Sequence, residues 1–304
     1  MRIVFMGTPE FAVASLRVLV ENEVNIVGVI TVPDKRKGRG KQMQGSAVKE
    51  YAESQGLHIL QPTNLKSEDF IQELKALKAD LQIVVAFRML PEVVWNMPML
   101  GTFNLHGSLL PQYRGAAPIN WAIINGEKET GVTTFLLKHE IDTGNIIFQE
   151  KEEIFPEDNV GTLYERLMVK GADLVLKTVR AIENEDYSLS EQQTGSELKS
   201  APKIHKETCQ IDWSKNSMEL FNFVRGLNPY PSAWTVINDK KFKIHQVSVA
   251  ESNQSTNLTP GQPEVVDKKV IRIKTGDGFV TLDVLQPEGK KRMKAEDFLR
   301  GNSI

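Results

Sequence analysis

The chain has 304 residues, of which 40% are hydrophobic and 25% are charged, and its formal net charge is −2. This length accommodates two domains with separate cores, and the composition excludes an intrinsically disordered chain. A single cysteine, Cys209, excludes an internal disulfide and favours a reducing compartment. The apolar runs are too short for a signal peptide or a membrane-spanning helix, so we expect a soluble, cytoplasmic protein.

Charge is distributed unevenly along the chain. Residues 1–203 contain 22 basic and 27 acidic side chains, whereas residues 204–304 contain 15 and 12. A mildly basic C-terminal third on a mildly acidic body favours an anionic partner. His205 and Cys209 are four residues apart, but no second pair of ligands lies near them in the sequence, so we expect no metal site.

The first half of the chain alternates short β-branched runs with helical patterns, as in a parallel sheet with crossover helices. The predicted strands are Arg2–Met6, Ile26–Val32, Leu81–Phe87, Thr102–Leu105 and Val132–Leu137. One predicted helix begins at Thr8 and Pro9. Three further predicted helices cover Ala47–Gln55, Ser67–Leu77 and Thr162–Glu183. These elements predict a doubly wound, Rossmann-like α/β domain over residues 1–186. The turn Gly7-Thr8-Pro9 is not a Gly-x-Gly-x-x-Gly fingerprint, so a dinucleotide site is not supported.

Residues 187–206 are polar and predict an interdomain linker. Short strands separated by turn signals then follow, with one helix before them and a short helix after them. The strands are Ala233–Ile237, Phe242–Val249, Val270–Lys274 and Phe279–Leu285, and the helices are Ser217–Arg225 and Ala295–Arg300. Residues 207–304 therefore predict a small, OB-like β-barrel.

An amide and an imidazole lie two residues apart at the end of one predicted strand. Asn104 and His106 would project from the same face of an extended segment, at the sheet edge where doubly wound folds bind ligands. Such a pair suits a reaction that develops negative charge on a carbonyl oxygen, as in acyl transfer. Taken alone, a histidine near a strand end is more often structural than catalytic, and an asparagine there often caps a turn.

Asp142 follows the next predicted strand, within the turn Ile141-Asp142-Thr143-Gly144. A carboxylate near His106 would orient the imidazole ring and favour its protonated form. The same residue in an Asp-Thr-Gly turn is also a common backbone cap. Its position after the neighbouring strand favours a catalytic role.

The segment 34–41 is a basic loop with two glycines, directly after the second predicted strand. It is either a solvated surface or a flexible grip on a polyanion, whose phosphates would bind its side chains. Its basic residues are Lys35, Arg36, Lys37, Arg39 and Lys41. Further basic positions on the predicted barrel are Lys240, Lys241, Lys243, Lys268, Lys269, Arg272, Lys290, Lys291, Arg292 and Lys294.

The fifteen residues from Asn104 to Pro118, together with Asp142-Thr143-Gly144, closely resemble the signature of the folate-dependent formyltransferases. The resemblance extends nearly end to end, and its C-terminal motifs and basic loop are similar to those of the branch that acts on tRNA. These further motifs are Gly7-Thr8-Pro9-Glu10-Phe11-Ala12, Gly161-Thr162-Leu163-Tyr164, Ile211-Asp212-Trp213, Arg225-x-x-Asn228-Pro229-Tyr230-Pro231 and Thr275-Gly276-Asp277-Gly278.

The resemblance implies transfer of the formyl group of 10-formyltetrahydrofolate to the α-amino group of methionine esterified to initiator tRNA, without a metal. It further implies that Asn104, His106 and Asp142 are catalytic and that Arg39 contacts the acceptor end. Ser108, Leu109, Leu110 and Pro111 would contact folate, and the barrel would hold more of the tRNA. We expect a monomer with no membrane partner.

One segment departs from the family pattern. Phe87-Arg88-Met89 replaces the usual Ala-Tyr-Gly run, in a stretch that is one residue shorter and that lines the pterin pocket in relatives. Two other functions are compatible with parts of the sequence. A sibling enzyme would formylate a nucleotide-linked amino sugar or glycinamide ribonucleotide, but needs neither the basic loop nor the basic C-terminal domain. A catalytically silent RNA-binding module needs no Asn104, His106 and Asp142 set.

Overall fold

The chain divides into two compact units, each with its own sheet and its own apolar core. The computed structural model describes residues 1–37, 42–193, 197–250 and 257–304. The first unit comprises residues 1–114, 131–152 and 165–199, and the second comprises residues 115–130, 153–164 and 200–304. The domain boundaries at 186 and 207 stay a prediction.

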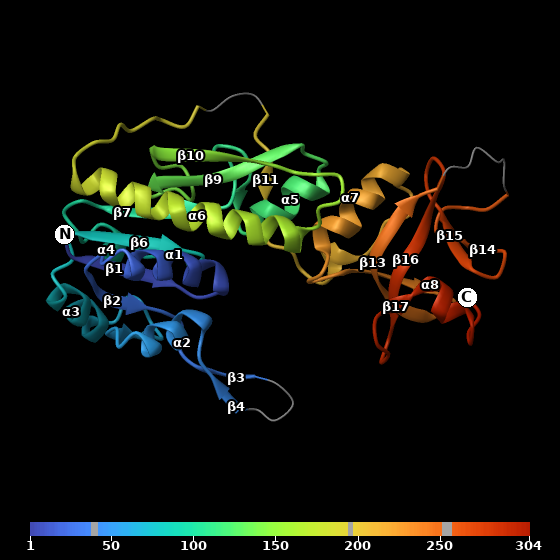
Figure 1. The fold of residues 1–304 in the computed structure, drawn as a ribbon, viewed down its shortest axis with the longest axis horizontal. Coiled ribbons are helices and arrows are strands. Elements are labelled where there is room, and N and C mark those ends of the chain that lie inside the picture. Colours follow the sequence, from blue (N-terminus) through green and yellow to red (C-terminus); the bar gives the residue numbers. More distant parts are fainter. Residues whose placement is uncertain (38–41, 194–196, 251–256) are drawn as a thin grey trace. The chain divides into compact units, whose positions relative to one another are not determined.

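The described residues of the first unit include a seven-stranded sheet with the strand order β10-β9-β7-β6-β1-β2-β5 (Figure 1). The strands from β7 to β5 pair in parallel, and β9 runs antiparallel to β7. Both β1 and β6 are buried along their whole length, as expected of apolar strands covered on both faces. The bounds are β1 Ile3–Gly7, β2 Ile26–Ile30, β5 Ile59–Leu60, β6 Leu81–Val85, β7 Thr102–His106, β9 Glu129–Leu136 and β10 Ile146–Glu153.

The crossover helices begin at residues that favour helix starts. Pro9 lies at the N-cap of α1, and the Ser46 hydroxyl accepts a hydrogen bond from the Lys49 backbone N–H at the start of α2. The bounds are α1 Glu10–Glu21, α2 Ala47–Ser54, α3 Glu68–Ala76, α4 Glu92–Trp95 and α6 Val160–Glu183.

Helix α6 determines which face of β7 is free for function. A Cβ added at Gly171 of α6 would lie 2.8 Å from Cδ2 of Leu105, and the Thr178 hydroxyl lies 2.9 Å from that of Thr134 in β9. Leu105 therefore faces α6. Because side chains alternate along a strand, Asn104 and His106 face the opposite side of the sheet.

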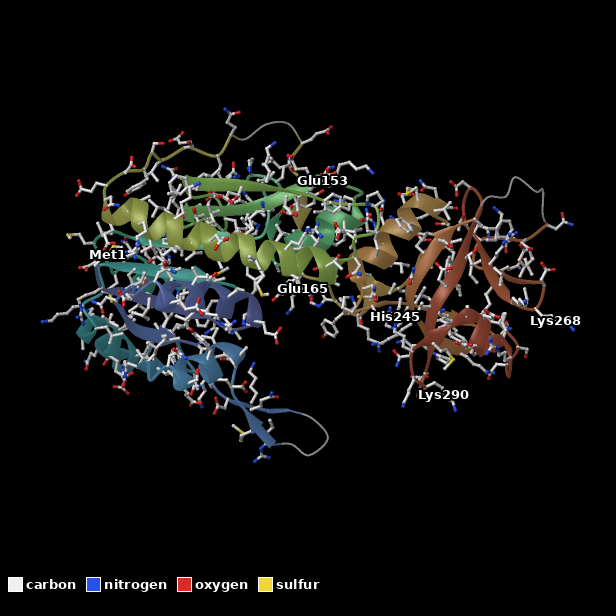
Figure 2. All side chains as sticks on the ribbon, viewed as in Figure 1. Met1, Glu153, Glu165, His245, Lys268 and Lys290 are labelled. Atoms are coloured by element: carbon white, nitrogen blue, oxygen red, sulfur yellow. The ribbon has the colours of Figure 1, made fainter. Side chains whose placement is uncertain are left out.

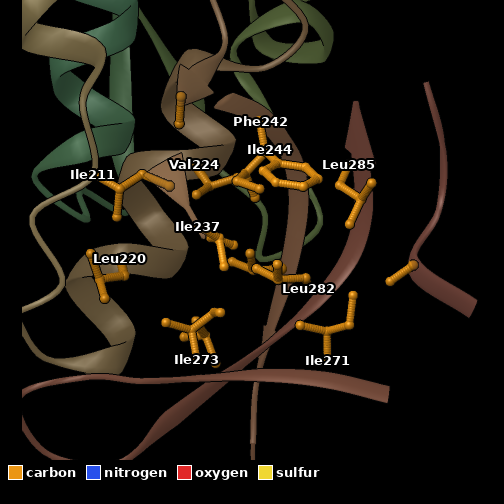
Figure 3. Packing of buried hydrophobic residues seen from close by; sticks show 14 of the residues in the cluster. Ile211, Leu220, Val224, Ile237, Phe242, Ile244, Ile271, Ile273, Leu282 and Leu285 are labelled. Carbon is orange, nitrogen blue, oxygen red and sulfur yellow. The ribbon is translucent and has the colours of Figure 1, made fainter. Parts of the chain in front are cut away.

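The second unit contains an antiparallel sheet with the strand order β12-β13-β16-β15-β14, and β17 pairs with β16. Inward-facing residues of these strands form a core with helix α7, as Figure 3 shows for Leu220, Val224, Phe242, Ile244 and Leu282. The strands are β12 Ala233–Ile237, β13 Lys240–Val249, β14 Pro263–Val266, β15 Val270–Lys274, β16 Phe279–Pro287 and β17 Met293–Lys294. The helices are α5 Pro118–Ile124, η1 Glu207–Cys209, α7 Ser217–Leu227 and α8 Ala295–Leu299.

The predicted fold class is confirmed, with a parallel-dominated Rossmann-like sheet followed by an antiparallel β domain. The prediction of a loop across the basic segment 34–41 is wrong over Lys35–Lys37, because these residues form β3, which pairs antiparallel with β4 directly after the segment. The sequence pattern also missed several short elements, since two to eight residues are too few to show a clear period. The elements missed are β3 Lys35–Lys37, β4 Gln42–Gln44, β5, β8 Arg114–Gly115, β10, β11 Ser200–Ala201, β14, β17, α4, α5 and η1.

Candidate active site

His106 is the last residue of β7, and its ring is fixed by the loop that follows the strand. The residue is only 6% exposed, and its Nε2 lies 2.9 Å from the carbonyl oxygen of Tyr113. A carbonyl oxygen only accepts hydrogen bonds, so Nε2 carries a proton and donates it. The ring is therefore held through Nε2, and Nδ1 is the nitrogen left for chemistry.

Asp142 lies on the Nδ1 side of the ring. One of its carboxylate oxygens, Oδ2, is 3.9 Å from Nδ1 of His106, and only 14% of the Asp142 side chain is exposed. That separation is too long for a hydrogen bond but suits a charge pair when the ring is protonated. The expected proximity of Asp142 and His106 is present in the structure.

The turn that carries Asp142 has a specific backbone. Asp142 has a φ of 55°, in the left-handed region that costs a non-glycine residue about 1–3 kcal/mol. Two residues later, a Cβ added at Gly144 would lie 1.5 Å from the carbonyl oxygen of Leu136. Only glycine fits at position 144, and this explains the glycine of the Asp-Thr-Gly sequence.

Asn104 lies two residues before His106 on β7, on the same face of the sheet. Its backbone pairs with Val84 of β6 on one side and Phe135 of β9 on the other. Both neighbours belong to buried strands, so the backbone of Asn104 is held in place while its side chain remains partly accessible. An amide in this position has N–H donors for a developing oxyanion.

The loop from Ser108 to Tyr113 is held by buried hydrogen bonds. The Thr133 hydroxyl donates to the Ser108 carbonyl oxygen at 2.6 Å and accepts from the Leu110 backbone N–H at 3.2 Å. Nε2 of Gln149 donates to the Leu110 carbonyl oxygen at 2.9 Å. The side chains of Ser108 and Leu110 are 0% and 3% exposed. They therefore support the loop that positions Tyr113, and folate contact by residues 108–111 stays a prediction.

A cavity of about 530 Å³ opens beside the Asp142 turn. It combines aromatic and aliphatic walls with charged and amide groups, which is typical of sites for small organic ligands. The residues that line it are Trp95, Arg114, Leu137, Lys138, His139, Glu140, Thr143 and Gln192. His139 lies with its ring edge-on to Trp95 at a centroid distance of 5.6 Å, and its Nε2 is 3.1 Å from Glu92.

The segment that departs from the family pattern is pinned by Arg88. The guanidinium group donates to the carbonyl oxygens of Pro62 and Thr63, and lies over the ring of Phe87 at 5.6 Å from its centroid. Burial lowers the pKa of Arg88. Arg88 thus anchors this segment to the chain after β5.

The start of the basic segment is held by hydrogen bonds to Asp34. Nε2 of Gln61 and Nζ of Lys49 donate to the Asp34 carboxylate at 2.8 and 2.6 Å, and these bonds lower the pKa of Asp34. Lys35 and Arg36 are exposed on β3, and Lys37 ends that strand. Arg39 and Lys41 lie outside the described residues.

The basic side chains of the second unit lie both on strands and in turns, with Lys240, Lys241 and Lys243 on β13. Lys268 lies in the turn between β14 and β15, whereas Lys290 lies in the turn between β16 and β17 (Figure 2). Lys241 contacts the ring of Trp234, with Nζ 4.0 Å from its centroid. The unit therefore presents separate points of positive charge.

Among residues 1–37, 42–193, 197–250 and 257–304, no three His, Cys, Asp or Glu side chains gather in a way that could hold a metal ion. Within the same ranges, no helix combines the length and the apolar character needed to cross a membrane.

Two functional neighbours of the site were missed from the sequence. Gln192 bonds to the Asp142 turn and to Arg114, although it lies in the predicted linker. The carbonyl of Tyr113 holds His106, and it was named only as a member of the motif. Every residue has a backbone carbonyl, so the sequence does not indicate which carbonyl holds His106. A single glutamine in a polar segment does not indicate a contact with the site either.

Comparison with known proteins gives matches over both units. Residues 1–179 match the family model described as formyl transferase, and residues 203–303 match that of the formyl transferase C-terminal domain. The methionyl-tRNA formyltransferase of Phocaeicola vulgatus is 56% identical over 313 residues, covering 99% of this chain and 95% of that protein. The methionyl-tRNA formyltransferase of Bacteroides thetaiotaomicron is 53% identical over 307 residues, with the same coverage.

A solved structure shares the fold. HypX from Aquifex aeolicus in complex with tetrahydrofolic acid is 20% identical and aligns with a TM-score of 0.64. The alignment covers 99% of this chain and 48% of that one.

Proposed function

The chain belongs to the methionyl-tRNA formyltransferase family, and from this premise we propose which of its residues carry out formyl transfer. The activity is formylation of the α-amino group of methionine on initiator tRNA. The observation that carries this function is the match of 53–56% identity over 99% of the chain, which includes the second unit.

The reaction forms one bond to the formyl carbon and breaks another. The methionyl amine attacks the formyl carbon, a tetrahedral oxyanion forms, and the carbon–nitrogen bond to folate then breaks. The amine loses a proton, and the departing folate nitrogen gains one. Asn104 supplies amide N–H donors to the oxyanion, and loss of one such donor typically slows a reaction by about 10²–10³-fold.

His106 acts through Nδ1, because Nε2 is committed to the Tyr113 carbonyl. A protonated Nδ1 is a second donor to the oxyanion. Asp142, 3.9 Å away, stabilises the positive charge of the ring and accepts the proton that the attacking amine loses. Asn104, His106 and Asp142 are therefore our catalytic set.

The cavity beside the Asp142 turn is our candidate site for the one-carbon donor, 10-formyltetrahydrofolate. Its volume lies within the range of sites for ligands of that size, and Trp95 and Leu137 offer flat and apolar walls for a ring system. Thr143 lines the cavity directly after Asp142, so a donor bound there lies next to the catalytic turn. We further propose that Ser108, Leu109, Leu110 and Pro111 contact the folate, as the family resemblance implies.

Lys35, Arg36, Lys37, Arg39 and Lys41 are our candidates for contact with the tRNA. Lys35 and Arg36 are exposed, and the bonds of Asp34 to Lys49 and Gln61 fix the start of β3. Contacts of this kind to phosphates weaken as salt rises. We assign catalysis to the N-terminal domain of residues 1–186 and further tRNA contacts to residues 207–304, with a monomer as the working form.

The first test compares three acceptors with 10-formyltetrahydrofolate as donor: methionyl-initiator tRNA, methionyl-elongator tRNA and a nucleotide-linked amino sugar. We expect fast formylation of the initiator tRNA alone. Formylation of the sugar alone would assign the chain to the sibling enzymes, and binding of tRNA without formylation would make it a silent RNA-binding module.

The second test replaces Lys35 and Arg36 together by glutamine. We expect the KM for tRNA to rise about tenfold at physiological salt, and its dependence on salt to weaken, because two phosphate contacts are lost. Replacement of the exposed Lys66 and Lys75 by glutamine is the matched control and should leave the KM unchanged. Equal effects of the two double variants would show that only net charge matters.

A further inference from the structure

A polar strap runs along the catalytic loops within the first unit; it consists of the described residues 190–193 and 197–199. It begins where Ser190 and Ile146 exchange two backbone hydrogen bonds of 2.8 and 2.9 Å. Farther along, it contacts the Asp142 turn and the loop that ends at Tyr113. The strap thus reaches the partners of His106 on both sides of the ring.

Gln192 makes the contact on the Asp142 side. Its Nε2 donates to the carbonyl oxygens of Asp142 and Gly144, both at 2.8 Å. Its Oε1 accepts from Nε and Nη2 of Arg114 at 3.1 and 2.6 Å. A guanidinium group only donates and a carbonyl only accepts, so the amide has a single orientation that satisfies all four bonds.

Gln112 and Lys199 make the contacts on the Tyr113 side. Nε2 of Gln112 donates to the Glu197 carbonyl oxygen at 3.2 Å, and its Oε1 accepts from the Lys199 backbone N–H at 2.9 Å. The backbone N–H of Tyr113 donates to the Lys199 carbonyl oxygen at 2.7 Å. The same Tyr113 holds Nε2 of His106 through its own carbonyl.

We propose that Gln192 is a positioning residue for catalysis, which keeps the Asp142 carboxylate opposite Nδ1 of His106. The inference rests on the proposed catalytic role of Asp142. Residue 142 has a left-handed backbone, and such a conformation persists only where the surroundings fix it. Gln192 fixes it by bonding the carbonyls of residues 142 and 144, while Arg114 fixes Gln192.

A decisive variant is Gln192→Glu, because it distinguishes the role of the amide oxygen from the role of the amide N–H groups. The glutamate keeps an acceptor for Arg114, but it has no donor for the two carbonyls and places a carboxylate against them. We expect kcat to fall by about 10–100-fold, since displacement of a catalytic group by about 1 Å has effects of this size. The KM values for both substrates and the melting temperature should stay close to those of the parent chain.

A double-mutant cycle with Asp142→Asn distinguishes positioning from a general structural role. If Gln192 acts through Asp142, Gln192→Glu should slow the Asp142→Asn enzyme by less than about threefold. If the double variant instead loses rate by the product of the two single-variant losses, the inference is overturned and the proposed function stays intact. An Asp142→Asn enzyme with full activity would instead remove the catalytic role of Asp142, and the inference with it.

Gln192 also lines the cavity, so ligand contact is the competing explanation. That explanation predicts a raised KM for the folate donor with little change in kcat, and this result would overturn the inference. Gln193→Ala is the matched control, because Gln193 is the exposed neighbour, and it should behave as the parent chain. If the glutamate variant does not fold, Gln192→Ala undergoes the same cycle with the same two expected outcomes.

Discussion

The proposed catalytic loops of the first unit and the core of the second unit are held together by different forces. Polar contacts hold the loops, with His106 fixed by a carbonyl and the Asp142 turn fixed by an amide from residue 192. The core of the second unit is apolar, and Phe242, Ile244, Leu282 and Leu285 are each at most 2% exposed. Substitutions in the loops should therefore affect the reaction rate first, and substitutions in the core should affect the free energy of unfolding first.

The largest effect is expected in the second core. Phe242→Ala removes a ring that packs edge-on against Phe298 at a centroid distance of 5.6 Å. We expect a loss of about 3–5 kcal/mol in the free energy of unfolding, measured by denaturant titration, with kcat nearly unchanged while the chain is folded. Val236→Ala, at a 52% exposed position, is the control and should cost less than about 0.5 kcal/mol.

The next effect is expected at Asn104, the proposed oxyanion donor. Asn104→Ala should lower kcat by about 10²–10³-fold, because an amide donor to the developing charge is lost. The melting temperature should change little, because the backbone of β7 keeps its pairing with β6 and β9. A stable variant with normal kcat would remove Asn104 from the catalytic set.

A substitution of Gly144 should affect both the stability of the fold and kcat. In Gly144→Ala the new Cβ would lie 1.5 Å from the Leu136 carbonyl oxygen, so the Asp142 turn must move. We expect a loss of stability of about 1–3 kcal/mol and a kcat lowered by at least tenfold. Gly301→Ala, where an added Cβ meets no atom within 4 Å, should change neither. A normal kcat in the first variant would show that the turn tolerates displacement.

The smallest effect is a pH-dependent contribution in the second unit. Burial alone would raise the pKa of Asp277, but hydrogen bonds from the Ser217 backbone N–H and hydroxyl and from the Thr275 hydroxyl outweigh it, so the pKa lies below 3.8. A lowered pKa means that the ionised carboxylate stabilises the fold above about pH 4, and that this contribution is lost as the pH falls through the lowered pKa.

Asp277→Asn should therefore cost about 1 kcal/mol at pH 7, a modest value because the site is exposed to water. The difference from the parent chain should shrink toward pH 3. Urea titrations of both chains at the two pH values measure it. If the difference in the free energy of unfolding between the two chains is the same at both pH values, the cost of Asp277→Asn does not come from the charge of the carboxylate.

Several elements could be predicted because their information is local. The pattern of apolar residues and turn signals predicted β12 and β15 with their observed bounds, and the helical pattern predicted α2 and α3 to within one residue at each end. The shared orientation of Asn104 and His106 follows from strand geometry alone. By contrast, β10 is mostly polar and partly exposed, so its pattern did not distinguish it from a loop.

The sequence by itself determined the fold class, the family, and the candidates Asn104, His106 and Asp142, because periodicity and motifs are properties of neighbouring residues. Only the tertiary structure decided how His106 is held, which of its nitrogens is available, and that Gln192 bonds to the Asp142 turn. The partner of Gln192 lies 50 residues earlier in the chain, and its hydrogen bond is made to a backbone carbonyl. Every residue has a backbone carbonyl, so only the folded structure determines which carbonyl a given side chain bonds to.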